Sequence, residues 1–394
     1  MQQIETAVIG GGIAGLALSL ALVRKGHKVT LFEANGGAYQ ASVRNFGLIW
    51  PSGQKIGPMR QMALHSRELW IKAAREASFS INPNGSLYLA QTDTECDIIN
   101  WYVQNDQEED NPARILSPSE AQNLAPAVKP DHLKQALYYP SDACVQPVNA
   151  CRQIEKYLSQ HDMVDIQYFT KVLMVDGNRL ITAREVYKAD RIFVASGHFF
   201  KEWYPQLFET SKSRICKLHM MRTTEQPDGW ALGPNLCGGL TLLHYPSFAE
   251  APDIQNLHKE ALDKWPDQMK HGIHVLIAQH HDGKITLGDS HHYESDVSPF
   301  DEEAVFNAIM EYTEHISQIP NLKLESRWQG VYAKSGDSLP IVERIDDYTT
   351  FVGALGGAGM TLSMGLADWV VNDSIPETLD LSGSRFSAPA ESNP

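Results

Sequence analysis

The residues of this 394-residue chain whose types and spacing could do chemistry begin near its start, in the cluster "GGGIAG" at positions 10–15. Gly10 permits a tight turn, Gly12 lets the backbone approach a pyrophosphate, and Gly15 lets a helix pack closely on a strand. Glu33 follows a second apolar run and can accept hydrogen bonds from ribose hydroxyl groups. The spacing therefore predicts a dinucleotide-binding turn.

This interpretation requires a strand before the glycines and a helix after them. Ala7–Ile9 is a short apolar run typical of a buried parallel strand, and Leu16–Val23 is rich in alanine and leucine, which favour helix. The helix N-terminus would offer free N–H groups and a partial positive charge to phosphates. The alternative is an ordinary glycine-rich turn that binds nothing. The acid Glu33, in register with both elements, argues against that alternative.

Two later strands also lead into turns of small residues. The apolar run Arg191–Ala195 precedes Ser196 and Gly197, and a strand after position 349 runs into a glycine-rich turn, with a helix beginning near Met360. We therefore expect one domain built from both chain ends, with the middle of the chain inserted into it. The alternative is that the C-terminal helix has small residues only because it packs closely.

The middle of the chain has a different pattern. Asp282 and Gly283 lie between two strand-like runs, which is a strong hairpin signal and predicts an antiparallel sheet in a second domain. Ser117 and Glu120 are spaced as a capping box, which predicts a short helix after them. We also expect a strand over residues 166–173 and a helix over residues 300–319.

Composition excludes several classes of partner. The formal net charge is −15 and long runs of lysine or arginine are absent, so nucleic acids and anionic membranes are poor partners. No apolar run reaches the roughly 18 residues of a membrane-spanning helix, and the glycine motif begins too early for a signal peptide. The five cysteines are scattered and form no CxxC pair, as expected for reduced thiols in a cytoplasmic protein.

The three small-residue turns together resemble those of the D-amino-acid oxidase-like superfamily, which includes glycine oxidase and sarcosine oxidase, over nearly the whole chain. This resemblance implies that the dinucleotide is FAD. It also implies an α/β fold, with a Rossmann-like FAD-binding domain of the glutathione-reductase type and an inserted α+β substrate domain that carries an antiparallel sheet. The expected FAD-binding domain comprises residues 1–84, 142–215 and 325–380. The substrate domain comprises 85–141 and 216–324, and a disordered tail 381–394.

The resemblance implies that the first motif holds the pyrophosphate, that the acid holds the adenosine ribose, and that the last turn aims a helix N-terminus at the flavin. The expected cofactor-binding residues are Gly10, Gly12, Ile13, Ala14, Gly15, Glu33, Ala34, Ser42, Arg44, Asn45, Val172, Ala195, Ser196, Gly197, Gly357, Gly359, Met360 and Thr361.

A narrower likeness lies in "ASVRNFGLIWPSGQ", "GGLTLLHYPSF", "LGDSHHY" and "GVYAKSGD". These segments are similar to a branch of FAD-dependent oxidoreductases linked to aminophosphonate breakdown. The implied substrates are 2-aminoethylphosphonate or an N-methyl or hydroxylated relative.

Two departures from the oxidases of this superfamily bear on chemistry. Those enzymes carry Leu-Arg-Pro where this chain has Val331–Lys334, so the arginine that binds a substrate carboxylate is missing. Lys334 could bind a phosphonate as a point charge, or it could simply be exposed. Sarcosine-oxidase-like enzymes also carry a lysine over the flavin where Thr286 stands here, which leaves O2 or another molecule as the electron acceptor.

The other candidate substrate residues are Arg44, His244, Tyr245 and Tyr332. Arg44, with Asn45, is expected to contact the flavin or an anion, or else to lie in a surface loop. His244 and Tyr245 are expected in a strand-like run, facing the flavin or buried in the core. The histidine pairs at positions 280–281 and 291–292 suggest a metal site. No group of acids or cysteines accompanies them, so we expect no bound metal.

The expected reaction is oxidation of the C–N bond of a small amine. Hydride passes to the flavin, and the resulting imine hydrolyses to an aldehyde and an amine. Because this chemistry needs little acid or base beyond amine deprotonation, no residue is predicted to be catalytic in its own right. The alternatives are an oxidase of glycine, sarcosine or D-amino acids, and a non-catalytic flavoprotein subunit. The sequence leaves open the exact amine, covalent attachment of the flavin and the oligomeric state.

Overall fold

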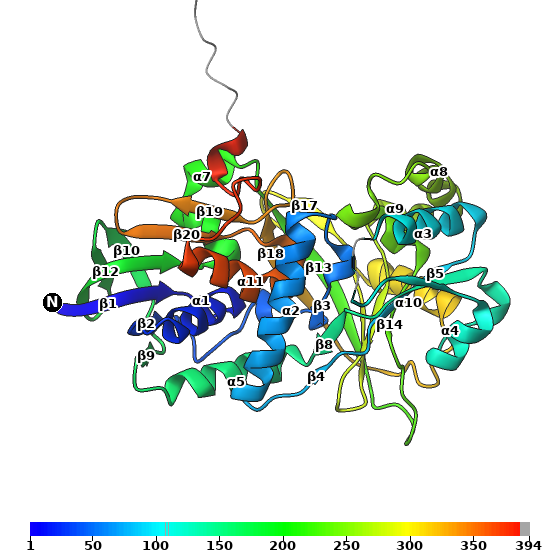
Figure 1. Cartoon of the computed structure of the whole chain (residues 1–394), viewed down its shortest axis with the longest axis horizontal. Coiled ribbons are helices and arrows are strands. Elements are labelled where there is room, and N and C mark those ends of the chain that lie inside the picture. Colours follow the sequence, from blue (N-terminus) through cyan, green and yellow to red (C-terminus); the bar gives the residue numbers. More distant parts are fainter. Residues whose placement is uncertain (107, 109, 387–394) are drawn as a thin grey trace, which may run out of the picture.

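The computed structural model describes residues 1–106, 108 and 110–386. It has two parts that lie side by side, and each is built around its own sheet (Figure 1). The blue N-terminal strand and the orange C-terminal strands lie together in one part, while the middle of the chain forms most of the other. The expected α/β class, with one mixed and one largely antiparallel sheet, is confirmed.

The first sheet has eight strands in the order β10-β11-β12-β1-β2-β9, with β20 paired to β12 and β19 paired to β20. Its parallel core consists of β12, β1, β2, β9 and β20. The strands are β1 (Gln2–Ile9), β2 (Val29–Phe32), β9 (Val164–Gln167), β10 (Val172–Asp176), β11 (Arg179–Thr182), β12 (Val186–Val194), β19 (Ile341–Arg344) and β20 (Thr349–Gly353). Because Ile9 pairs with both Phe32 and Val194, the residues after these strands meet at one edge.

Four long helices are associated with this sheet: α1 (Ile13–Arg24), α2 (Pro58–Glu76), α5 (Pro147–Ser159) and α11 (Gly359–Asn372). α1 and α11 are apolar almost all round and pack against each other inside the domain. Because they begin directly after β1 and shortly after β20, their N-termini lie at the same sheet edge. The three turns predicted from small residues are therefore brought together.

The second sheet has nine strands in the order β17-β13-β16-β15-β14-β5-β7-β6, with β18 paired to β13. The strands are β5 (Ser86–Ala90), β6 (Arg114–Leu116), β7 (Gln135–Tyr139), β13 (Arg214–Thr223), β14 (Asn235–Cys237), β15 (Leu276–Gln279), β16 (Ile285–Gly288), β17 (His292–Glu294) and β18 (Leu324–Lys334). β15 and β16 form the predicted hairpin around Asp282 and Gly283.

Helices of the second part lie beside this sheet, at the right of Figure 1. They are α3 (Asp93–Asn105), α4 (Pro118–Leu124), α8 (Ile254–Lys264), α9 (Pro266–Lys270) and α10 (Glu303–Ile316). α4 begins with the predicted capping box of Ser117 and Glu120. The short helices α6 (Phe200–Trp203) and α7 (Pro205–Thr210) follow β12, and a small sheet of β3 (Leu48–Ile49), β8 (Ala143–Val145) and β4 (Ile81–Asn82) lies between the two parts.

The structure differs from three sequence predictions. The predicted strand over residues 166–173 is two strands, β9 and β10, because the chain turns at Phe169, whose φ is +50°. Residues 325–334 were expected in the FAD-binding domain, but β18 pairs along its length with β13 of the second sheet. Residues 381–386 were expected to be disordered, but Val342 donates a hydrogen bond to the carbonyl of Leu381. The rest of that tail lies outside the described residues.

All five cysteines are free and buried. No helix among the described residues combines the length and the apolar character needed to cross a bilayer.

Candidate functional site

A cavity of about 540 Å³ lies at the edge where β1, β2, β12 and β20 end. Its lining contains most of the cofactor residues predicted from the sequence. Those that line it are Gly10, Gly12, Ile13, Ala14, Glu33, Ala34, Ser42, Val172, Ala195, Ser196, Gly197 and Gly359. Gly15 does not line it, because this residue packs α1 against the turn instead.

The glycines of the first turn have the geometry that their predicted roles require. Gly10 has φ of +106°, and a Cβ there would lie 2.4 Å from the carbonyl oxygen of Ala195. A Cβ at Gly15 would lie 1.8 Å from the carbonyl oxygen of Gly10. α1 then begins without a side-chain cap on Gly12, so its first turn faces the cavity with uncapped N–H groups apart from Ile13 N–H, which donates to Ser42 Oγ at 2.8 Å.

Glu33 is held by neighbouring donors at the far end of this cavity. One carboxylate oxygen accepts from Gly11 N–H at 2.7 Å, and the other accepts from Asn35 N–H at 2.7 Å and Asn35 Nδ2 at 3.0 Å. These bonds fix the carboxylate in one orientation while it still lines the cavity. An oriented acceptor at this position suits the hydroxyl groups of a ribose.

A second cavity of about 150 Å³ adjoins the first and shares Ile13, Ser42, Tyr332 and Gly359 with it. All five predicted substrate residues line it: Arg44, His244, Tyr245, Tyr332 and Lys334. The remaining predicted cofactor residues, Asn45, Gly357, Met360 and Thr361, also line it. α11 begins here without a side-chain cap, so a second helix N-terminus faces this cavity.

The residues present fit FAD. A dinucleotide can lie along the two joined cavities, with phosphates at the N-terminus of α1, a ribose at Glu33 and a flavin ring at the N-terminus of α11. At the start of α11 the space is open, because nothing lies within 4 Å of the position that a Cβ of Gly359 would take.

Two cations border the second cavity without a carboxylate partner. Lys334 Nζ donates to Tyr293 Oη at 3.4 Å and lies over the Tyr293 ring, and burial lowers the pKa of this lysine. Arg44 donates to the carbonyls of Tyr39 and Gln329, at 3.1 and 3.3 Å. Within the part of the chain that the structure describes, neither cation forms an ion pair, so both can contribute charge to an anionic ligand.

Sequence reasoning missed Asp289, which is the one acidic side chain among the described residues that line this cavity. It is 5% exposed, and burial raises the pKa of its carboxyl well above the ordinary value. Its Oδ1 has no hydrogen-bond partner among the residues that the structure describes. The segment "LGDSHHY" was singled out as a likeness, but nothing local in it shows that Asp289 faces a cavity.

Two residue placements differ from expectation. His244 is the C-cap of the 3-10 helix Gly239–Leu243, and Tyr245 follows it, so neither residue lies in a strand. Both residues still line the cavity. Thr286 lies in β16 but lines neither cavity, because its hydroxyl makes a 3.0 Å hydrogen bond with His280 Nε2. The sequence predicts Thr286 over the flavin, whereas the structure keeps it out of the lining of both cavities.

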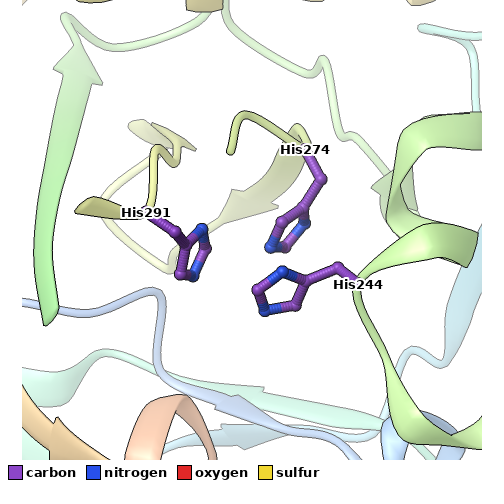
Figure 2. A group of neighbouring side chains, drawn as sticks. All are labelled: His244, His274 and His291. Carbon is purple, nitrogen blue, oxygen red and sulfur yellow. The ribbon is translucent and has the colours of Figure 1, made fainter. Parts of the chain in front are cut away.

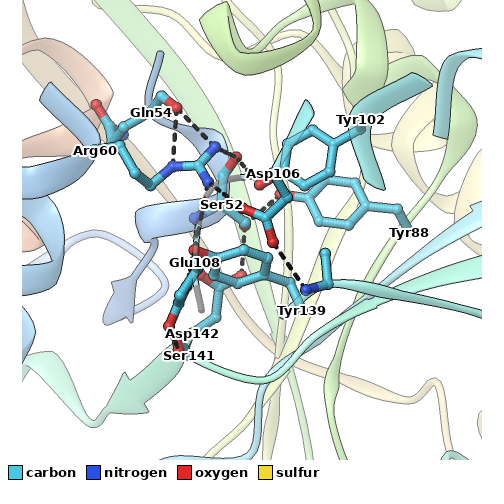
Figure 3. Close-up of polar contacts among 11 residues, drawn as sticks. Ser52, Gln54, Arg60, Tyr88, Tyr102, Asp106, Glu108, Tyr139, Ser141 and Asp142 are labelled. Carbon is cyan, nitrogen blue, oxygen red and sulfur yellow. Dashed lines mark hydrogen bonds and ion pairs between the residues drawn. The ribbon is translucent and has the colours of Figure 1, made fainter. Parts of the chain in front are cut away.

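A buried polar network supports the wall of the second cavity (Figure 3). Arg60 donates to the carbonyls of Ser52 and Gln54 at 3.2 and 3.0 Å, and it pairs with Asp106 at 3.4 Å. Trp50 and Gln54 line the cavity on either side of Ser52. The guanidinium therefore fixes the backbone that carries these two lining residues.

Asp142 holds the other side of the same loop (Figure 3). It accepts from Ser52 N–H at 3.0 Å and from Ser52 Oγ at 2.5 Å, and the same hydroxyl contacts Tyr88 Oη at 2.6 Å. Burial raises the pKa of Asp142 to about 7. The network joins α2 to β5, so it couples the two parts of the molecule beside the site.

The fold and the site together define a flavoprotein of the FAD-dependent oxidoreductase class. The chain belongs to the DAO family, described as FAD dependent oxidoreductase, whose family model matches residues 5–372. FAD is accordingly its cofactor.

Similarity to individual proteins is more distant. A glycine oxidase from Geobacillus kaustophilus is 24% identical over 205 residues, which is 49% of this chain and 54% of that protein, so the chain spans about half the length of this curated relative. Among solved structures, an L-proline dehydrogenase from P. horikoshii has a TM-score of 0.79 at 19% identity, covering 98% of both chains. Glycine oxidase from Geobacillus kaustophilus has a TM-score of 0.76 at 17% identity, again covering 98% of both. These structures establish the fold.

Proposed function

We propose that the protein oxidises the C–N bond of a small amine that carries a phosphonate, such as 2-aminoethylphosphonate or an N-methyl or hydroxylated relative. The observation that carries this proposal is the cavity with two cations, Arg44 and Lys334, that have no carboxylate partner among the described residues, together with one buried carboxyl, Asp289. A doubly charged anion gains more from two cations than a carboxylate does, because each charge-assisted hydrogen bond contributes roughly 1.5–3 kcal/mol.

Bound FAD supplies the hydride acceptor for this reaction. The chain supplies binding, orientation and a proton acceptor. Arg44 and Lys334 attract the anionic end of the substrate, while Asp289 Oδ1 binds the ammonium end and accepts its proton. Only the ionised carboxylate of Asp289 accepts this proton, and burial raises the pKa at which it forms. Proton transfer to it gives the neutral amine from which a hydride departs.

The apolar wall of the cavity excludes water around this chemistry. Phe46, Leu48, Leu218 and Leu276 line it and are nearly fully buried. A dry cavity strengthens the attraction between the cations and the substrate anion. The imine product hydrolyses to an aldehyde and an amine once water reaches it. The electron acceptor for the second half of the cycle is O2 or another oxidant.

A carboxylate substrate such as glycine or sarcosine is the second candidate, because the curated glycine oxidase matches about half of this chain. The deciding experiment is steady-state turnover of 2-aminoethylphosphonate and its N-methyl form against glycine and sarcosine, in wild type and in Lys334→Met. This substitution keeps much of the side-chain stem and removes the charge.

We expect wild type to prefer the phosphonates, and Lys334→Met to lower kcat/KM for them by about tenfold or more, since 1.4 kcal/mol is a factor of ten. Lys212→Met, at an exposed position outside both cavities, is the matched control. A wild-type preference for glycine or sarcosine would show that the substrate is a carboxylate. A retained preference in Lys334→Met would show that another group binds the anion.

A further inference from the structure

Three histidines that are distant in the sequence meet beside the second cavity. His244 follows a 3-10 helix, His274 precedes β15, and His291 precedes β17. One ring nitrogen from each lies within 4.8 Å of the others, and Figure 2 shows the rings converging from separate segments. All three line the cavity. We propose that His244, His274 and His291 bind a divalent transition-metal ion of the zinc class, with an open coordination position that faces the substrate cavity.

The hydrogen bonds of the cluster support this proposal. His274 is only 3% exposed, and neither of its ring nitrogens has a hydrogen-bond partner in the described part of the chain, whereas buried polar atoms are normally paired. His291 Nδ1 lies 3.1 Å from the carbonyl oxygen of Gly272 and donates its proton there. That bond leaves the lone pair of His291 Nε2 for a ligand, as is usual for metal-binding histidines.

Asp289 lies next to the same nitrogens without bonding them. Its carboxyl oxygens are 3.5 Å from His274 Nε2 and 3.8 Å from His291 Nε2. These distances are longer than a good hydrogen bond, and they are close to the separation between two ligand atoms bound to the same metal ion. Nitrogens bound to zinc at about 2.1 Å in a tetrahedron are about 3.4 Å apart, so each ring would move inward by less than about 1 Å.

The open position gives the ion a role in the proposed function, on which this part of the inference rests. A divalent ion would add two positive charges there, which matches a phosphonate. Three protein ligands and one exchangeable position are typical of zinc sites that bind substrate.

The first test uses the wild-type protein with FAD bound, stripped of metals by a chelator. We expect Zn²⁺ to bind in equilibrium dialysis at about one ion per chain, and Co²⁺ to give visible ligand-field bands at longer wavelength than the flavin. 2-Aminoethylphosphonate should change those bands, whereas ethylamine should not. Absence of both Zn²⁺ binding and Co²⁺ bands would overturn the site without any mutation.

The second test uses His274→Ala and His291→Ala, with His281→Ala as the matched control because that histidine is exposed on the β15–β16 hairpin. Flavin absorbance and the thermal transition report whether each variant is folded. We expect the first two variants to lose the bound Zn²⁺ and the control to retain it. Equal binding by all three would place the ion elsewhere. If the Co²⁺ bands do not change when 2-aminoethylphosphonate is added, the open coordination position does not face the substrate cavity. The turnover experiment tests the substrate separately.

Discussion

At the scale of single residues, the site divides into a part that sequence reveals and a part that it does not. The roles of Gly10, Gly15 and Glu33 are local, because each acts within one strand–turn–helix unit whose spacing is visible in the sequence. Asp289 and His274 line the same cavity because separate segments of the chain bring them together. Their neighbours in the sequence carry no sign of that meeting, so residue type and spacing could not predict them.

The role of Asp289 as proton acceptor is tested by Asp289→Asn, which keeps the shape and removes the basic group. We expect kcat at neutral pH to fall by about 100-fold or more, the usual contribution of a general base. Activity should recover as pH rises, because solution then supplies the neutral amine. The pH dependence of kcat for 2-aminoethylphosphonate measures this. An unchanged profile would show that the carboxyl does not take the proton.

The role of Glu33 is tested by Glu33→Gln, which removes one acceptor oxygen and places an amide against Gly11 N–H or Asn35. Losing a charge-assisted hydrogen bond costs roughly 1.5–3 kcal/mol, so the dissociation constant for FAD should rise by about 10-fold or more. Fluorescence titration of the flavin-free protein measures it. Glu185→Gln, at an exposed position, is the control, and equal affinities of the two variants would contradict the assignment.

At the scale of elements, the regular units follow from the sequence more closely than their boundaries do. The α1 helix, the β15–β16 hairpin and the capping box at α4 follow from local rules about apolar runs, turn residues and caps. The break between β9 and β10 does not, because the run there is continuously strand-like and only the turn at Phe169 divides it. The membership of β18 depends on its pairing with β13, which is a long-range contact.

The buried network beneath the loop at Ser52 makes a prediction about pH. Burial raises the pKa of Asp142 from 3.8 in the unfolded chain to about 7 in the folded protein. The folded protein therefore gains its full stability from the protonated carboxyl below pH 3.8, and this gain is lost as the pH rises to the folded-state pKa. Relative to Asp142→Asn, the free energy of unfolding of wild type should therefore fall between pH 4 and 7, by on the order of 4 kcal/mol. Urea unfolding of both proteins across this range measures the difference. If the free energies of unfolding of wild type and Asp142→Asn change with pH in parallel, the pKa of Asp142 is not raised by folding.

At the scale of the whole molecule, the first sheet combines strands from both ends of the chain, and most strands of the second sheet come from the middle. The cofactor cavity lies where β1, β2, β12 and β20 end, and the adjoining cavity also includes residues of β13 and β15. The adjoining cavity is therefore lined by both parts. The glycine turns at the first cavity follow from local spacing, whereas the lining of the second depends on long-range contacts, so the sequence indicates a substrate only by resemblance.

The central claim is that this junction passes electrons from a phosphonate-bearing amine to bound flavin. The most direct measurement is anaerobic mixing of the purified FAD-bound protein with 2-aminoethylphosphonate, its N-methyl form, glycine and sarcosine, while the flavin absorbance is recorded. The account predicts that a phosphonate bleaches the flavin band, at a lower concentration and faster than glycine or sarcosine. Faster bleaching by the carboxylates would contradict the assigned substrate, and no bleaching by any of these amines would contradict the assigned reaction.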